Sequence, residues 1–196
     1  MRTASIDRKT NETDIQIELD LDGDGTCDVD TGVGFFDHML THLARHGLFN
    51  LSVKAKGDLH IDAHHTVEDV GICLGKCFLE AIREPKGLTR YGHAVIPMDE
   101  ALAEVAVDFS GRPFLVFNGD VPQTALGNFD LELAREFMQA FAVNSRTTLH
   151  VNLRYGDNTH HCIESIFKAF ARALGQAVRI DPRVKGIPST KGMLEA

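Results

Sequence analysis

The residues best suited to chemistry follow a His-His-x-x-Glu pattern that occurs twice, 96 positions apart, in this chain of 196 residues. The two copies are His64, His65 and Glu68 and, later, His160, His161 and Glu164. After each copy, apolar residues recur at spacings of three and four, which predicts that each copy begins a long amphipathic helix. On a helix the first histidine and the glutamate share one face, whereas the two adjacent histidines lie about 100° apart. One metal ion therefore cannot easily bind both histidines of a pair, and each copy is expected to serve two metals.

Imidazole and carboxylate ligands without thiolate favour Mn, Fe or Zn over Mg or Ca. The alternative is that the histidines only occupy the first turn of each helix, because helix N-termini often carry polar residues. A single His-His pair is more often a surface or capping feature than a pair of ligands. Two copies, each before an amphipathic helix in a chain with 10 histidines, favour a two-metal site.

A third histidine-rich segment lies at 38–46, where a shorter helix is predicted. His38, His42 and His46 recur every four residues and form a stripe on one side of this helix. Such a stripe can be a solvated face, but its closeness in sequence to the first His-His copy predicts that at least one of the three reaches metal or substrate. We expect the shorter helix of each half to supply one further ligand near its start: His38 in the first half and an acid such as Glu136 in the second.

The rest of the first half predicts strands around these helices. Strict alternation at 13–21 predicts a half-buried strand, and Asp-Gly-Asp-Gly at 22–25 predicts a hairpin turn into a strand at 27–30. An EF-hand calcium loop is rejected here, because Thr31 stands where a bidentate glutamate is needed. The other expected features are an N-cap at Asp37, a helix end at Gly47, a strand at 51–55 that 59–61 extends, and a stop of the long helix at Glu84-Pro85.

The second half repeats this order of hairpin, shorter helix, strand and long helix. Its expected features are a strand at 101–109, a turn at 110–113, a strand at 114–117 that pairs back as a hairpin, an N-cap at Asp130 for a helix to Val143, a strand at 147–153, and a long helix that Asp181-Pro182 ends. Internal duplication explains this repetition better than chance. We therefore predict one domain, 1–196, built from two halves of about 1–90 and 91–196.

Composition excludes several classes of protein. With 43% hydrophobic and 24% charged residues the chain is ordinary globular material, and its net charge of −8 argues against nucleic acid as the main partner. The four cysteines have no zinc-ribbon or disulfide-scaffold spacing. We therefore expect free thiols in the core of a protein that resides in a reducing compartment. With no signal peptide and no long apolar run, a cytoplasmic protein without a membrane span is expected. The P-loop, Gly-x-Gly-x-x-Gly and Gly-x-Ser-x-Gly motifs are also absent, which leaves nucleotide-driven and serine-hydrolase chemistry unsupported.

Six short segments occur in a fixed order along the chain. They are FDHML at 36–40, DAHHTVED at 62–69, PMDEA at 97–101, DFSGRP at 108–113, the second His-His-x-x-Glu followed by FKA at 167–169, and PSTKG at 188–192. Together they resemble the imidazoleglycerol-phosphate dehydratase family, in its monofunctional form, from about residue 2 to residue 192. The resemblance implies an α+β fold of the ribosomal protein S5 domain 2-like class, with two duplicated half-domains that each form a four-stranded sheet backed by helices. It also implies a dimanganese site, and a homo-oligomer of about 24 subunits with active sites between subunits.

The resemblance further implies a role for individual residues. One Mn²⁺ would take His38, His65, His160 and Glu164, and the other would take His64, Glu68, His161 and Glu136, where some family members carry histidine in place of Glu136. The two histidines of each pair thus go to different metals, in agreement with the helix geometry. Glu12 would be the catalytic base. The residues that would bind the substrate and its phosphate are His46, Arg90, Arg112, Lys168, Ser189 and Lys191.

The implied reaction is the dehydration of imidazole glycerol phosphate to imidazole acetol phosphate in histidine biosynthesis. No pyridoxal or flavin motif supplies an electron sink, and no carbonyl acidifies the proton that is removed. Two metals on the ring nitrogens would stabilise an imidazolate, which could expel the hydroxyl to give a diazafulvene before Glu12 removes the neighbouring proton.

Two other classes of function remain open at this point. A di-metal carboxylate and histidine protein for metal storage or oxidation would use similar ligands, but ferritin-like sites need a bundle of four long helices and this chain has many predicted strands. A nucleic-acid-binding module could share the layout of sheets and helices, but the acidic charge argues against it.

Overall fold

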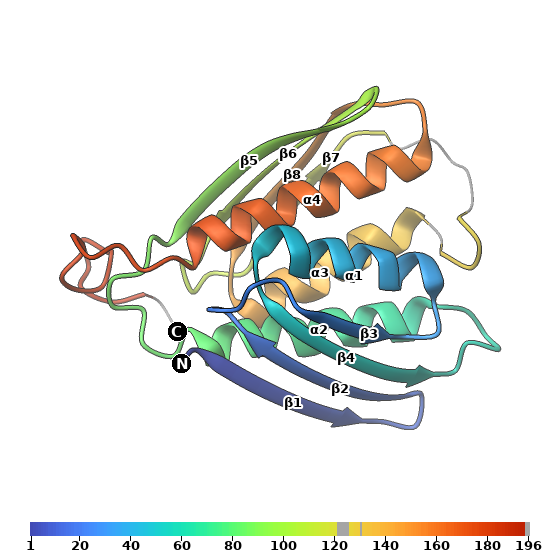
Figure 1. Ribbon diagram of the computed structural model, residues 1–196, viewed down its shortest axis with the longest axis horizontal. Helices are drawn as coiled ribbons and strands as arrows, with labels where there is room; N and C mark the ends of the chain where they lie inside the picture. Colours follow the sequence, from blue (N-terminus) through green and yellow to red (C-terminus); the bar gives the residue numbers. More distant parts are fainter. Residues whose placement is uncertain (121–125, 130, 195–196) are drawn as a thin grey trace.

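The computed structural model describes residues 1–120, 126–129 and 131–194 as an α+β protein with four helices between two four-stranded mixed sheets (Figure 1). The first sheet has the order β1-β2-β4-β3, and the second has the order β5-β6-β8-β7. The elements of the first half are β1 (Thr3–Lys9), β2 (Thr13–Asp20), β3 (Cys27–Asp30), α1 (Gly34–Gly47), β4 (Asn50–Gly57) and α2 (His64–Ala81). Those of the second half are β5 (Tyr91–Met98), β6 (Ala101–Asp108), β7 (Phe114–Asn118), α3 (Leu131–Ser145), β8 (Thr148–Tyr155) and α4 (Thr159–Ala177).

The strand pairings correct both predicted hairpins. The strands themselves are present, but β3 pairs parallel with β4, and β7 pairs parallel with β8. In each half the shorter helix lies between the two paired strands in sequence, as a parallel connection requires. The Asp-Gly-Asp-Gly segment is therefore a link across the end of the sheet, because β4 occupies the place beside β2.

Local predictions also need correction at three places. Residues 59–61 form a turn after β4 and do not extend it as a strand. Helix α1 begins at Gly34, and Asp37 does not cap it. Asp37 instead accepts hydrogen bonds from the backbone N–H and the hydroxyl of Thr31, at 2.9 and 2.5 Å, and so fixes the loop before the helix. The predicted cap at Asp130 lies outside the described residues.

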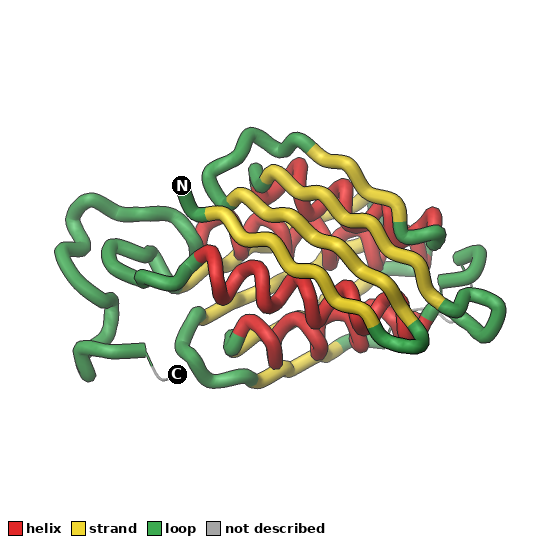
Figure 2. The backbone as a smooth tube through the Cα atoms, turned by 90° about the horizontal axis from the view of Figure 1, so that it is seen from below, coloured by secondary structure: helices red, strands yellow, loops and turns green. Residues whose placement is uncertain are grey.

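Close helix packing joins the two halves. Helix α2 packs against α3, and α1 packs against α4. Gly71 and Gly75 permit the first contact, because a Cβ at these positions would lie 2.9 and 2.7 Å from the carbonyl oxygens of Phe137 and Phe141. Figure 2 shows that the strands of the first sheet lie over the helices. No described element covers the outer face of these strands.

The hydrophobic core fills the space between the sheets. Alternate residues of β2 and β6 are buried, as the alternation in sequence predicted. Fully buried phenylalanines from several elements contact one another at the centre, among them the edge-on pairs Phe78–Phe141 and Phe141–Phe170, with ring centroids 5.2 and 5.0 Å apart. Cys73 and Cys77 are free and buried in this core, as expected.

Candidate metal centre

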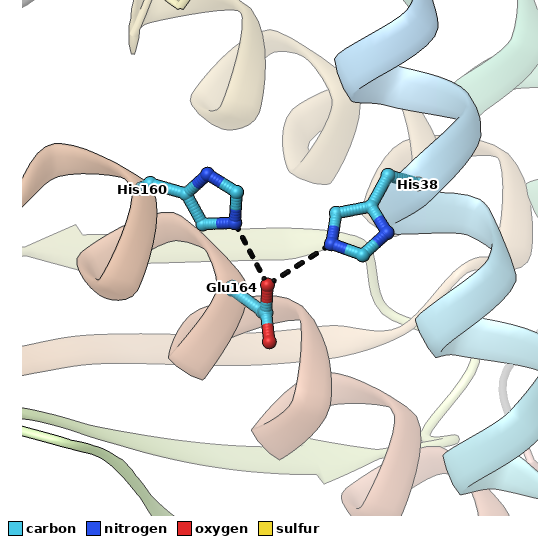
Figure 3. Close-up of side chains that lie close together, drawn as sticks. All are labelled: His38, His160 and Glu164. Carbon is cyan, nitrogen blue, oxygen red and sulfur yellow. Dashed lines mark hydrogen bonds and ion pairs between the residues drawn. The ribbon is translucent and has the colours of Figure 1, made fainter.

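Three predicted ligands from opposite halves meet where α1 lies beside α4. His38 projects from α1, while His160 and Glu164 project from the first turns of α4 (Figure 3). The Nε2 atoms of His38 and His160 lie 3.1 and 2.9 Å from the same carboxylate oxygen, Oε2 of Glu164. The i,i+4 relation of His160 and Glu164 predicted from the sequence is therefore present, and the first half adds His38 to it.

Glu164 is the buried centre of this cluster. Its other oxygen, Oε1, accepts a hydrogen bond from Lys168 Nζ at 2.5 Å, and His42 Nε2 lies 3.4 Å from the same oxygen. Burial raises the pKa of Glu164, but its hydrogen bonds to Lys168 and His160 outweigh this effect and bring the pKa to about 2. Burial lowers the pKa of His42 to about 4. Glu164 is therefore held as a carboxylate, which is the form of this group that metal ligation needs, and the imidazole beside it at His42 is neutral.

The donor set fits a divalent metal ion. One ligand atom from each of His38, His160 and Glu164 lies within 4.8 Å of the others, and among the described residues this is the one group of three or more His, Cys, Asp or Glu side chains that meets this condition. Two imidazoles and one carboxylate suit Mn, Fe or Zn. The cluster can thus hold a metal, and three protein ligands leave positions open for further ligands.

The first His-His copy lies outside this cluster. His64 Nε2 is 3.9 Å from Glu68 Oε2, so this i,i+4 pair also forms. His65 turns to other partners: its Nδ1 donates a hydrogen bond to Asp58 Oδ2 at 2.9 Å, and Glu12 Oε2 lies 4.0 Å from the same nitrogen. The hydrogen bond to Asp58 raises the pKa of His65.

The second histidine of the other copy has a similar environment. His161 Nδ1 donates a hydrogen bond to Glu100 Oε2 at 2.7 Å, and this bond raises the pKa of His161 while it lowers that of Glu100 to about 2. Glu136 is half-buried on α3, which packs against α2. Within the described part of a single chain, His65, His161 and Glu136 do not join the metal-sized cluster.

A cationic pocket gathers most of the residues predicted to bind phosphate. It has a volume of about 520 Å³ and is lined by Arg90, Arg112, Ser189 and Lys191, among others. Arg90 is buried and forms a bidentate salt bridge with Asp108, in which Nε lies 2.7 Å from Oδ1 and Nη2 lies 3.1 Å from Oδ2. Its Nη1 donates to the carbonyl of Pro188 at 2.8 Å, so Arg90 anchors the tail that carries Ser189 and Lys191.

Two predicted substrate residues lie elsewhere. Lys168 contacts Glu164 in the candidate metal cluster and is not among the residues that line the cationic pocket. His46 lines a separate pocket between α1, β5 and α4, together with His93 and Arg172. Burial lowers the pKa of His46.

No sequence pattern indicated that Asp58 and Glu100 are the partners of the second histidines, His65 and His161. Asp58 immediately follows β4, and Glu100 lies in the two-residue turn between β5 and β6. Asp99, the other residue of this turn, has a φ of 47°, a left-handed conformation that Asp tolerates better than most residues. A pattern search could have marked these acids only as turn residues, because their contacts depend on the tertiary fold.

Comparisons with known proteins agree with this geometry. The family model described as imidazoleglycerol-phosphate dehydratase matches residues 31–174 of the chain. The chain belongs to the imidazoleglycerol-phosphate dehydratase family. It is 56% identical over 194 residues to the imidazoleglycerol-phosphate dehydratase of Bacillus licheniformis, a match that covers 99% of this chain and 100% of the relative. The resemblance seen in the sequence is therefore confirmed, and membership of the family makes this protein a lyase of histidine biosynthesis.

Solved structures of the dehydratase family have the same fold. The crystal structure of imidazoleglycerol-phosphate dehydratase from Staphylococcus aureus superposes with a TM-score of 0.83 at 44% identity, covering 91% of this chain and 99% of that one. The structure of IGPD from Pyrococcus furiosus in complex with (S)-C348 gives a TM-score of 0.84 at 35% identity and covers 96% of this chain and 100% of that one. The predicted α+β class with two helix-backed four-stranded sheets is thus confirmed. In the part of the chain that the structure describes, no helix is both long and apolar enough to cross a membrane.

Proposed function

We propose that this chain dehydrates imidazole glycerol phosphate to imidazole acetol phosphate with two Mn²⁺ ions per active site. The observation that carries the proposal is the cluster of His38, His160 and Glu164, which unites the two halves around a buried carboxylate. Membership of the dehydratase family supports the substrate and the reaction.

The ligands of the two metals would come from all four helices. One would take His38, His160 and Glu164 together with His65, and the other would take His64, Glu68, His161 and Glu136. Bound metals would act as Lewis acids on the substrate's imidazole and would supply the electron sink that this chain's side chains lack.

Proton transfer falls to Glu12 in this proposal. Its side chain is half exposed and lies 4.0 Å from His65 Nδ1, beside a proposed ligand and open to a substrate. Nδ1 of His65 already donates its hydrogen bond to Asp58, so Glu12 is not needed to hold the imidazole of His65 in place. A base at this position could remove the proton from the carbon next to the one that bears the imidazole ring. The same group could return a proton during tautomerisation.

The phosphate would bind in the cationic pocket, and its position argues that each active site spans two chains. The backbone N–H of Arg90, in that pocket, donates to the carbonyl of Ala177 at the end of α4. His160 lies at the other end of this helix, about 25 Å away at 1.5 Å per residue. In Figure 1 the tail that lines the pocket and the first turn of α4 lie at opposite ends of the molecule. A small phosphorylated imidazole cannot reach both within one chain, which supports a homo-oligomer with shared sites, such as the proposed 24-mer.

Subunit mixing tests this arrangement. Glu164→Gln and Lys191→Ala each damage a different end of the proposed site, so each variant alone should be nearly inactive on imidazole glycerol phosphate. Variants that are co-assembled in equal amounts should regain up to about one quarter of the wild-type turnover, because some sites combine two intact ends. Two inactive variants that stay inactive after mixing, while wild-type chains treated in the same way remain active, would contradict the shared site.

A further inference from the structure

The second histidine of each His-His pair has the same type of contact, although the two contacts come from different places in the fold. In both cases Nδ1 donates to a carboxylate, at 2.9 Å from His65 to Asp58 and at 2.7 Å from His161 to Glu100. A histidine that donates from Nδ1 presents its Nε2 lone pair outward, which is the arrangement that carboxylate partners impose on metal-ligating histidines.

The topology shows that these carboxylates are not counterparts of each other. Glu100 directly precedes β6, and its counterpart in the first half is Glu12, which directly precedes β2. Asp58 belongs to the linker 58–63 between β4 and α2, whereas the corresponding linker 156–158 in the second half is three residues shorter. Among the described residues, the carboxylates within 4.0 Å of His161 are Glu100 and Asp99, and neither comes from that linker.

Each carboxylate is held by its surroundings. Glu100 Oε1 accepts hydrogen bonds from the backbone N–H groups of Asn158 and Asp157, at 2.8 and 3.3 Å, which ties the turn between β5 and β6 to the start of α4. Asp58 Oδ1 is buried without a hydrogen-bond partner among the described residues. Buried polar atoms are rarely left unpaired, so a carboxylate with one buried, unpaired oxygen indicates a role other than stability. The other oxygen of Asp58, Oδ2, accepts the hydrogen bond from His65.

We propose that Asp58 and Glu100 are positioning residues that fix the tautomer and direction of His65 and His161, so that each Nε2 can bind a metal. The proposal rests on the proposed function for the identity of these histidines as ligands. It also explains how two similar halves diverged. In the second half the glutamate before the second strand positions the histidine, whereas in the first half Asp58 does so and leaves Glu12 available for proton transfer.

Isosteric amides separate positioning from structural support. In Glu100→Gln the amide oxygen can still accept from the backbone of Asn158, so the loop stays tied to α4. The amide NH₂ group would then face Nδ1 of His161 and favour the tautomer that carries its proton on Nε2, which cannot bind a metal. Asp58→Asn acts on His65 in the same way.

The test is a titration of metal-free protein with Mn²⁺, in which the electron paramagnetic resonance signal of free Mn²⁺ reports the unbound fraction. Wild type should bind two ions per chain, whereas Glu100→Gln and Asp58→Asn should each weaken one of the two sites by about 10- to 100-fold. Glu104→Gln is the matched control, because this carboxylate in the same half contacts Arg154 and His93 and no proposed ligand. Its titration should match that of wild type.

The outcomes separate this inference from the proposed function. If Glu100→Gln and Asp58→Asn titrate like Glu104→Gln, the positioning role is wrong, even where the enzyme is active. If wild type binds two ions without dehydrating the substrate while each amide variant loses one tight site, the positioning role stands and the reaction is wrong. A wild-type protein that binds no Mn²⁺ overturns both.

Discussion

His38 and Glu164 are separated by 126 residues in sequence, yet Nε2 of the first lies 3.1 Å from Oε2 of the second. Each residue belongs to a different half, and the packing of α1 against α4 brings them together. The candidate centre therefore depends on the relative position of the two halves, and a change that separates these helices should remove metal binding before it unfolds either sheet.

Replacement of the central carboxylate should remove one metal. Glu164→Gln keeps the shape of the side chain but takes away the charge that His38, His160 and Lys168 surround. We expect the metal content of purified protein to fall from two ions per chain to at most one, with turnover reduced at least 100-fold. Elemental analysis alongside an activity assay checks this, and an unchanged metal content would show that Glu164 is not a ligand.

Replacement of the proposed base should separate binding from chemistry. Glu12→Gln should leave metal content and assembly size unchanged, because Glu12 is half exposed and Asp58 makes the direct hydrogen bond to His65. Turnover should fall by about 10²- to 10⁴-fold, the usual contribution of a general base. Asp14→Asn is a suitable control, since Asp14 pairs with the exposed Lys9. Turnover within a few-fold of wild type would exclude Glu12 as the base.

The contact between α2 and α3 should tolerate no added volume at Gly75. A Cβ there would lie 2.7 Å from the carbonyl oxygen of Phe141, which belongs to the backbone of α3 and cannot move aside easily. Gly75→Ala should destabilise the fold by about 1–3 kcal/mol, as overpacked cores do. Gly34→Ala adds the same methyl group where no atom lies within 4 Å, so its thermal midpoint should stay near that of wild type. Equal midpoints for the two variants would contradict the packing seen here.

The thiols should differ in reactivity towards Ellman's reagent at pH 8. Burial raises the pKa of Cys73 to about 11 and that of Cys77 to about 12, so both remain protonated and react slowly while the protein is folded. Cys27 is only half-buried and should supply the early phase of labelling. Cys27→Ser should abolish that phase, and denaturation should expose every remaining thiol. Rapid labelling of folded Cys27→Ser would show that the core opens readily.

Local patterns in the sequence predicted most of the helices and strands, but they could not predict which strands pair. The turn signals at 22–25 and 110–113 correctly indicated strands at 27–30 and 114–117, yet both strands were assigned to hairpins, whereas β3 and β7 are parallel partners of β4 and β8. Strand pairing depends on long-range contacts, and a turn signal between two strands does not identify the partner of either strand. The outer strand β1, whose residues alternate between exposed and half-buried, lacks the strongly apolar face that made β2 recognisable.

The site shows the same limit. Spacing within one helix predicted the contacts of His64 with Glu68 and of His160 with Glu164, because i,i+4 neighbours meet wherever the helix lies. Partners that approach from other elements were beyond this argument. Glu100 precedes His161 by 61 residues, and only the fold brings the turn between β5 and β6 to the start of α4.

The most direct test of the account is the metal content per chain, measured with dehydratase turnover before chelation, after chelation and after addition of Mn²⁺. We predict two ions per chain, loss of turnover when they are removed, and recovery of turnover when Mn²⁺ returns. Turnover that persists in metal-free protein would contradict the central claim that the two His-His-x-x-Glu copies hold the metals on which the reaction depends.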